Sequence, residues 1–167
     1  MASRSREPQV VRPSVLDRLI DDAPGHAADP EPGWEESIDR YRASVVRDLE
    51  WLLNTRRSPD PGPLDGFPEL RRSLMAYGPP DVTSLSGDTS QTRRRLLRQL
   101  EELIRIFEPR LTGARVRLDE GEAEGARQIR FVVEGMLRLE SADERVVFDT
   151  VLEVSSGRFV VRGDANA

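Results

Sequence analysis

The chain has 167 residues, enough for one domain of about 100 to 150 residues with its own hydrophobic core. A net charge of −5 argues against nucleic acid as a partner, and the absence of cysteine excludes disulfides, thiolate metal sites and cysteine nucleophiles. Every basic residue is an arginine, whose planar guanidinium suits bidentate pairing with carboxylates.

No part of the sequence approaches the roughly 20 consecutive apolar residues that cross a bilayer, and the arginines near the start have no apolar region behind them. We therefore expect a cytoplasmic protein without membrane insertion. Residues 1–12 carry no apolar pattern and predict a flexible tail. Residues 13–162 predict a single domain, and residues 163–167 a second tail.

The first half of the chain predicts helices. Apolar positions 15, 16, 19 and 20 predict a helix of two to three turns, which is too short to be stable alone and must dock on something. Apolar residues repeating at three and four predict a long helix from about Trp34 to Asn54. The same spacing predicts a second long helix that stops near Phe107, because Pro109 cannot continue it.

After Pro109 the apolar pattern changes to a period of two, which is typical of strands. Gly135 interrupts one apolar face, and we expect a bulge or a close approach of backbone there. Short connections favour antiparallel neighbours. The predicted fold class is α+β, with N-terminal helices packed on a C-terminal antiparallel sheet of three to four strands. The predicted strands are residues 115–118, 129–139, 146–154 and 158–162.

Glu108 and Arg110 flank Pro109 at the point where helix gives way to strand. Side chains two apart in an extended segment point the same way, so we expect this pair to project together, outward to a neighbouring molecule. A local alternative stays open, in which Arg110 or Arg56 pairs with Glu108 and staples the helical half to the sheet. The two interpretations can both be true.

The sequence shows no arrangement typical of an active site. No two carboxylates are singled out by their spacing for acid–base catalysis, and no glycine-rich phosphate loop or ligand-spaced metal cluster is present. The single histidine, His26, lies in a predicted loop. We expect no enzyme activity, no cofactor and no metal.

Three segments carry a resemblance to a known family. They are Leu49 to Arg56, Ser73 to Asp81, and Ile106 to Leu111. In order and spacing they resemble the TssE family of type VI secretion baseplate subunits, which belongs with the lysozyme-like wedge proteins of contractile phage baseplates. The similarity spans about residues 13 to 162, but the acidic turn at residues 120–125 has no match in it.

The resemblance implies a structural part of a baseplate wedge. Such a subunit sits with TssF and TssG in a six-fold baseplate and starts assembly of the contractile sheath of TssB and TssC around the inner tube. The resemblance implies a chain that is monomeric alone and present in six copies in the baseplate, with no glycosidase activity. The alternative function is a peptidoglycan-cleaving, lysozyme-like hydrolase.

Site residues follow from the resemblance by position. Glu108, Pro109 and Arg110 are implied as the sheath-facing element. Further implied contact residues are Asn54, Arg56, Tyr77, Gly78 and Asp81. The final predicted strand offers an edge that could extend a partner's sheet through backbone hydrogen bonds. Its residues are Arg158, Phe159, Val160, Val161 and Arg162.

Overall fold

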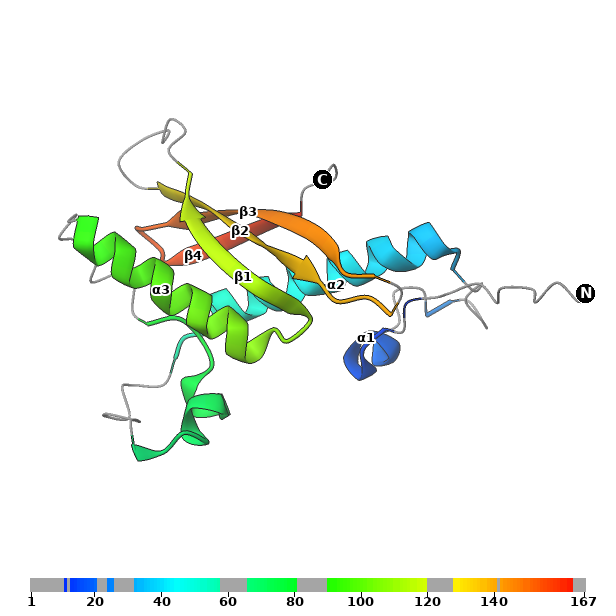
Figure 1. Ribbon diagram of the computed structural model, residues 1–167, viewed down its shortest axis with the longest axis horizontal. Coiled ribbons are helices and arrows are strands. Elements are labelled where there is room, and N and C mark those ends of the chain that lie inside the picture. Colours follow the sequence, from blue (N-terminus) through cyan, green and yellow to red (C-terminus); the bar gives the residue numbers. More distant parts are fainter. Residues whose placement is uncertain are drawn as a thin grey trace, which may run out of the picture.

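A computed structural model describes residues 11, 13–20, 24–25, 32–57, 66–80, 90–119, 128–140 and 142–163 (Figure 1). Within these residues, helical elements come first and strands follow, which confirms the predicted α+β class. The elements are α1 (Val15–Leu19), α2 (Trp34–Asn54), the 3-10 helices η2 (Leu70–Arg72) and η3 (Leu74–Ala76), α3 (Ser90–Phe107), β1 (Leu111–Leu118), β2 (Gln128–Leu137), β3 (Glu144–Glu153) and β4 (Arg158–Gly163).

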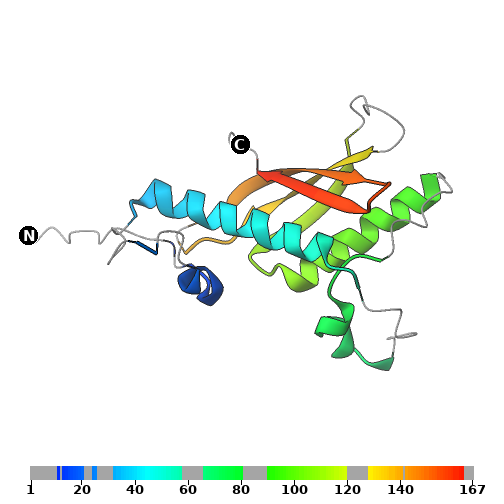
Figure 2. The same cartoon turned by 180° about the vertical axis from the view of Figure 1, so that it is seen from behind.

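The strands form one antiparallel sheet in the order β1-β2-β3-β4. Figures 1 and 2 show the sheet above both long helices, so that one sheet face is covered and the other is open. Burial along β3 alternates accordingly, because side chains of a strand point to opposite faces in turn. Phe148 and Leu152 are buried on the helix side, whereas Asp149 and Glu153 are exposed on the other.

The core lies between the two long helices and the covered face of the sheet. The apolar stripe of α2 buries Val45, Leu49, Leu52 and Leu53, and that of α3 buries Leu96, Leu100, Leu103 and Ile104. From the sheet, Phe131 and Phe159 meet edge to face with ring centroids 5.9 Å apart. Burial of each such side chain contributes about 1.5–3 kcal/mol, so packing rather than helix propensity holds these elements.

The predicted irregularity at Gly135 is confirmed. The β1–β2 register shifts between Thr112 and Arg115, so two residues of β1 lie opposite Gly135 and form a bulge. Gly113 within the bulge has a φ of 63°. A Cβ at position 135 would lie 2.9 Å from the Cδ1 atom of Leu111 and 3.1 Å from the carbonyl oxygen of Thr112, so a side chain there would force the packing to shift.

Both edges of the sheet receive hydrogen bonds from helix side chains. At the β4 edge, Asn54 of α2 donates to the carbonyl of Phe159 and accepts from its amide, each at 2.9 Å. At the β1 edge, Glu101 of α3 accepts from the amide of Val116 at 2.9 Å. The edge that the sequence predicts to be exposed on the last strand is therefore occupied at Phe159.

The first helix is shorter than predicted. It spans Val15–Leu19, begins with a capping box between Ser14 and Asp17, and is tied to α2 by an ion pair of 2.6 Å between Asp17 and Arg47. Its apolar side chains are not buried in the domain, contrary to what the stripe suggests: Val15 and Leu19 are 74% and 77% exposed. None of the helices in the described ranges has the length and apolar character to cross a bilayer.

Candidate interaction site at the helix–sheet junction

The junction between α3 and β1 is a tight turn around Pro109. The amide of Glu108 still donates to Ile104 at 2.8 Å, and the carbonyl of Glu108 accepts from Leu111 at 3.1 Å, so the chain reverses within a few residues. Pro109 is exposed at the tip of the turn, whereas Glu108 is only 3% exposed. The proline ring fixes the backbone φ there and stiffens the turn.

Arg110 binds Glu108 with both ends of its guanidinium. Nε donates to Oε1 at 2.7 Å and an Nη atom donates to Oε2 at 2.5 Å, which is the fork-to-carboxylate geometry that only arginine provides. The guanidinium also reaches α2, donating to Asp48 at 2.5 Å and to the hydroxyl of Ser44 at 3.1 Å. One arginine thus joins the α3–β1 turn to the middle of α2.

The same network continues to α1. Arg47 donates to Asp48 at 2.8 Å and to Asp17 at 2.6 Å, and Asp17 lies 4.0 Å from Arg110. We refer to Asp17, Arg47, Asp48, Glu108 and Arg110 as the charge cluster. It links α1, α2 and the α3–β1 turn through paired charges that are partly removed from solvent.

The pKa shifts within the charge cluster follow from this pairing. Burial opposes the charge of Arg110, but hydrogen bonds and Coulomb attraction from Glu108 and then Asp48 outweigh it, so its pKa is raised. Burial likewise opposes the charge of Asp17, yet hydrogen bonds from Ser14 and Arg47 prevail and lower the pKa of that carboxyl group. These two groups are therefore held in their charged forms.

The predicted outward direction of the pair is wrong for Glu108. Glu108 and Arg110 do share one side of the chain, as their spacing predicts, but that side faces α2 rather than solvent. The local alternative describes the geometry: Arg110 closes on Glu108 and staples helix to sheet. Arg56, the other arginine considered for this pairing, lies exposed just past the end of α2.

A cleft of about 300 Å³ opens beside the charge cluster and brings the three motif segments together. Tyr77 stands edge-on to Phe107, with ring centroids 5.1 Å apart, between the ends of α2 and α3. Pro109 and Trp51 line the cleft with them, and Leu16 of α1 completes it. Trp51 is 49% exposed, so the cleft has an apolar, solvent-accessible rim.

The other predicted contact residues lie in different parts of the structure. Gly78 is buried with a φ of 105°, and a Cβ there would lie 2.2 Å from the carbonyl oxygen of Thr55, so it packs the η3 loop against the end of α2. Asn54 lies at the β4 edge, away from the charge cluster. Asp81, the acidic turn at residues 120–125 and His26 fall outside the described residues.

Sequence reasoning missed the α2 side of the charge cluster. Ser44 and Asp48 lie on the same helix face as Val45, Leu49 and Leu52, and polar residues on a buried stripe are a signal of a hydrogen-bonded partner. The α1 contribution, Asp17, carries no such signal in the sequence. Within the described ranges, no group of three or more His, Asp or Glu side chains is placed to hold a metal ion.

The fold and this site define a structural interaction domain, in which paired charges fix three segments around an apolar-rimmed cleft. The family model described as "Baseplate wedge protein gp25" matches residues 39–142, which contain most of α2 and all of α3, β1 and β2. The chain belongs to this family of baseplate wedge proteins. No curated protein sequence matches it at a significant level. It is thus a structural component of a phage-tail-like baseplate, where it contacts other baseplate components.

Proposed function

We propose that the chain is the TssE-like wedge subunit of a type VI secretion baseplate. In this role it works in the cytoplasm, sits with TssF and TssG, and starts assembly of the TssB and TssC sheath. The observation that carries the proposal is that Arg110 joins the Glu108–Pro109–Arg110 turn to Asp48 of α2 beside a cleft lined from all three motif segments. Family membership supports the baseplate role, and the resemblance in these segments supports the type VI assignment.

The proposed contact with the sheath is made by β4. Phe159 directs its amide and carbonyl outward, as its bonds to Asn54 require, and residues two apart in a strand direct them the same way. The backbone amide and carbonyl of Val161 therefore also point away from β3. Those of Val160 point toward β3, where its partner is Val151. We expect a sheath strand to pair with Val161 and extend the sheet, beside the bonds that Asn54 already makes.

The charge cluster gives this contact a rigid base. Arg110 and Asp48 hold α2 against the α3–β1 turn, and α2 in turn lies along β4, where Asn54 bonds Phe159. The predicted interaction residues thus act in two ways: Glu108, Arg110 and Gly78 position the elements, while Pro109, Tyr77 and Arg56 lie where a neighbouring subunit can reach them. Pre-organisation of this kind lowers the entropy lost on assembly.

Co-purification with TssF and TssG, combined with sheath imaging in cells, tests the proposal. Wild-type chain should co-purify with both subunits and support sheath formation. Charge reversal at Glu108 or Arg110 should stop sheath assembly. Thermal melting of the purified variant shows whether assembly fails because the domain misfolds or because a contact with a neighbouring subunit is lost. Arg40→Glu, which breaks an exposed ion pair with Glu36 and lines neither cleft, is the control. Normal sheaths in cells that lack the chain would contradict the proposal.

We further propose that the chain is not a hydrolase. Glu108, the most buried carboxylate of the site, has both oxygens bound by Arg110, so neither oxygen is placed to meet a substrate. Purified, folded protein should release no fragments from peptidoglycan. Cleavage that is abolished by Glu108→Gln, with the fold retained, would establish the alternative instead.

A further inference from the structure

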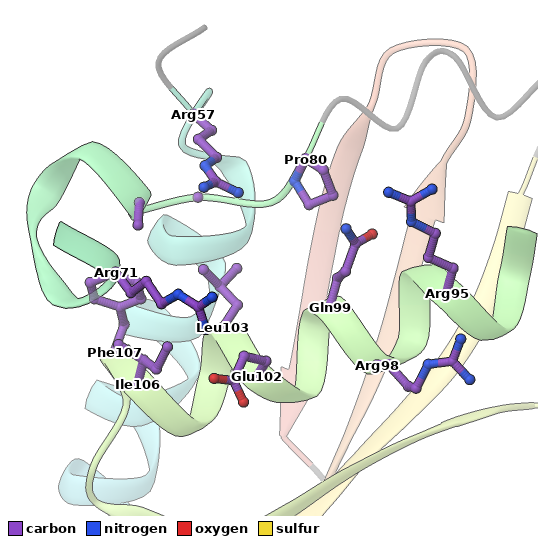
Figure 3. A pocket seen from close by; sticks show the side chains of 12 residues that line it. Arg57, Arg71, Pro80, Arg95, Arg98, Gln99, Glu102, Leu103, Ile106 and Phe107 are labelled. Carbon is purple, nitrogen blue, oxygen red and sulfur yellow. The ribbon is translucent and has the colours of Figure 1, made fainter. Parts of the chain in front are cut away.

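A second cleft, which we call the arginine groove, lies between α3 and the segment that carries η2 and η3. It encloses about 470 Å³ and has an apolar floor with a basic rim. Figure 3 shows Arg95 and Gln99 rising from α3 toward Pro80, with Arg57 approaching from the segment after α2. The floor is formed by Ala76, Leu103, Ile106 and Phe107, and the rim arginines are Arg57, Arg71, Arg95 and Arg98.

The positive charges of Arg95 and Arg98 on the groove rim are not balanced by the described residues that line the groove. Among the described lining residues the acidic one is Glu102, and both its oxygens already accept from Arg105, at 2.6 and 3.0 Å. Arg95 and Arg98 form no ion pair within the described part of the chain. Exposed guanidiniums without carboxylate partners, such as those of Arg95 and Arg98, favour an external anion.

Arg57 provides an independent observation. Its Nε atom is shielded from solvent and has no hydrogen-bond acceptor in the described structure. A buried donor without an acceptor costs free energy that a bound acceptor would recover. Arg57 lines the arginine groove, so an oxygen-bearing group bound there lies beside this guanidinium.

We propose that the arginine groove binds an acidic stretch of polypeptide from a neighbouring baseplate component, with an apolar side chain on the floor and carboxylates on the rim. Charge complementarity selects the carboxylates, and the floor formed by Leu103 and Ile106 selects an aliphatic or aromatic anchor. Nucleic acid fits less well. The whole chain carries a net charge of −5, which opposes binding of a polyanion.

This inference rests on the baseplate role of the family but not on the pairing of β4 with the sheath. The arginine groove and β4 involve different residues, so each can fail alone. A variant that lacks the rim arginines should weaken the contact with a baseplate neighbour. The backbone groups of Val161 remain available for pairing in such a variant.

Peptide binding by the full chain tests the chemistry. The probes are three fluorescein-labelled ligands: a peptide of repeated Glu-Glu-Leu, one of repeated Lys-Lys-Leu, and a single-stranded DNA of the same charge as the first. The acidic peptide should bind best, and more weakly as salt is added. Arg95→Glu combined with Arg98→Glu should weaken its binding by about tenfold or more, whereas Arg94→Glu, on the same helix but outside the groove, should change it by less than about twofold.

Each contrary result overturns the inference: no binding of the acidic peptide to the wild-type chain, DNA binding as tight as peptide binding, or an Arg94→Glu effect as large as that of the groove variant. All three arginine positions are exposed, so these substitutions should leave the melting temperature unchanged. Fluorescence anisotropy supplies the binding curves.

Crosslinking in the assembled baseplate tests the source of the segment. A photoreactive residue at position 99 should crosslink to an acidic segment of a baseplate neighbour, identified by mass spectrometry, and Arg95→Glu should reduce the yield. A crosslink to a neutral or basic segment, or none in a baseplate that has assembled, would overturn the inference. Co-purification of TssF and TssG from the same sample reports separately on the proposed function.

Discussion

The side chain of Asn54 occupies the position that a neighbouring strand would take beside Phe159. Its Nδ2 atom donates to the Phe159 carbonyl and its Oδ1 atom accepts from the Phe159 amide, both at 2.9 Å. An amide side chain offers the same donor and acceptor as a peptide group, so it continues the sheet by one bond pair. The end of α2 and the edge of β4 are thereby fixed to each other.

Asn54→Ala should lower the free energy of unfolding by about 1–2 kcal/mol, because two hydrogen bonds to backbone are lost. The amide of Phe159 should exchange with solvent faster in this variant, as measured by hydrogen exchange. Thr55→Ala, which removes a hydroxyl that donates back into α2 at Trp51, is a control that should leave exchange at Phe159 unchanged. Equal exchange in both variants would mean that Asn54 does not protect the edge.

Glu108→Gln should destabilise the domain by about 2–4 kcal/mol, because it removes the buried charge that pairs with the partly buried Arg110. Glu102→Gln breaks the exposed pair with Arg105 and should cost less than about 1 kcal/mol. Chemical denaturation measures both, and equal losses for Glu108→Gln and Glu102→Gln would refute the buried staple.

The attachment of α1 should depend on acid pH. The pKa of Asp17 lies below its ordinary value of 3.8 in the folded chain. A lowered folded-state pKa means that the stabilisation is fully present above 3.8 and is lost as the pH falls through the lower, folded value. Trp51 fluorescence should report this change, because Arg47 bonds Asp17 and lies 5.0 Å from the Trp51 ring centroid. Asp17→Asn should abolish the transition, and a transition unchanged in that variant would assign it elsewhere.

Gly78→Ala should destabilise the domain more than Gly113→Ala, although both glycines have positive φ. At position 113 a Cβ meets nothing within 4 Å, so the cost is the backbone strain of about 1–2 kcal/mol. At position 78 the Cβ would also collide with the carbonyl oxygen of Thr55, and the η3 loop must move from the end of α2. Thermal melting of the two variants should therefore separate them, and equal melting temperatures would contradict the close packing.

The sequence was sufficient for elements whose pattern is local. Apolar spacing predicts α2 from Trp34 to Asn54, as observed, and Pro109 predicts the end of α3 at Phe107. Gly135 stands out because it breaks a period of two, and the backbone does approach closely there. In each case the evidence lies within one segment of the chain.

The direction of the Glu108–Arg110 pair could not be predicted in the same way. Periodicity shows that two side chains share a side, but not which element lies against it, and Asp48 is 62 residues away from Arg110. For the same reason the apolar stripe of α1 predicts burial within the domain, whereas ion pairs hold α1 in place and leave Leu19 exposed.

The most direct test of the central claim is whether sheaths assemble in cells that carry the Val161→Pro variant. The amide of Val161 points away from β3, so proline there removes this amide without removing a β3–β4 bond, whereas proline at Val160 would disrupt the β3–β4 pairing itself. Val161→Ala is the control, because it removes two methyl groups of the buried side chain and keeps the amide. With both variants folded and bound to the baseplate, we expect sheaths with Val161→Ala and none with Val161→Pro. Normal sheaths with Val161→Pro would contradict the claim that β4 pairs with the sheath.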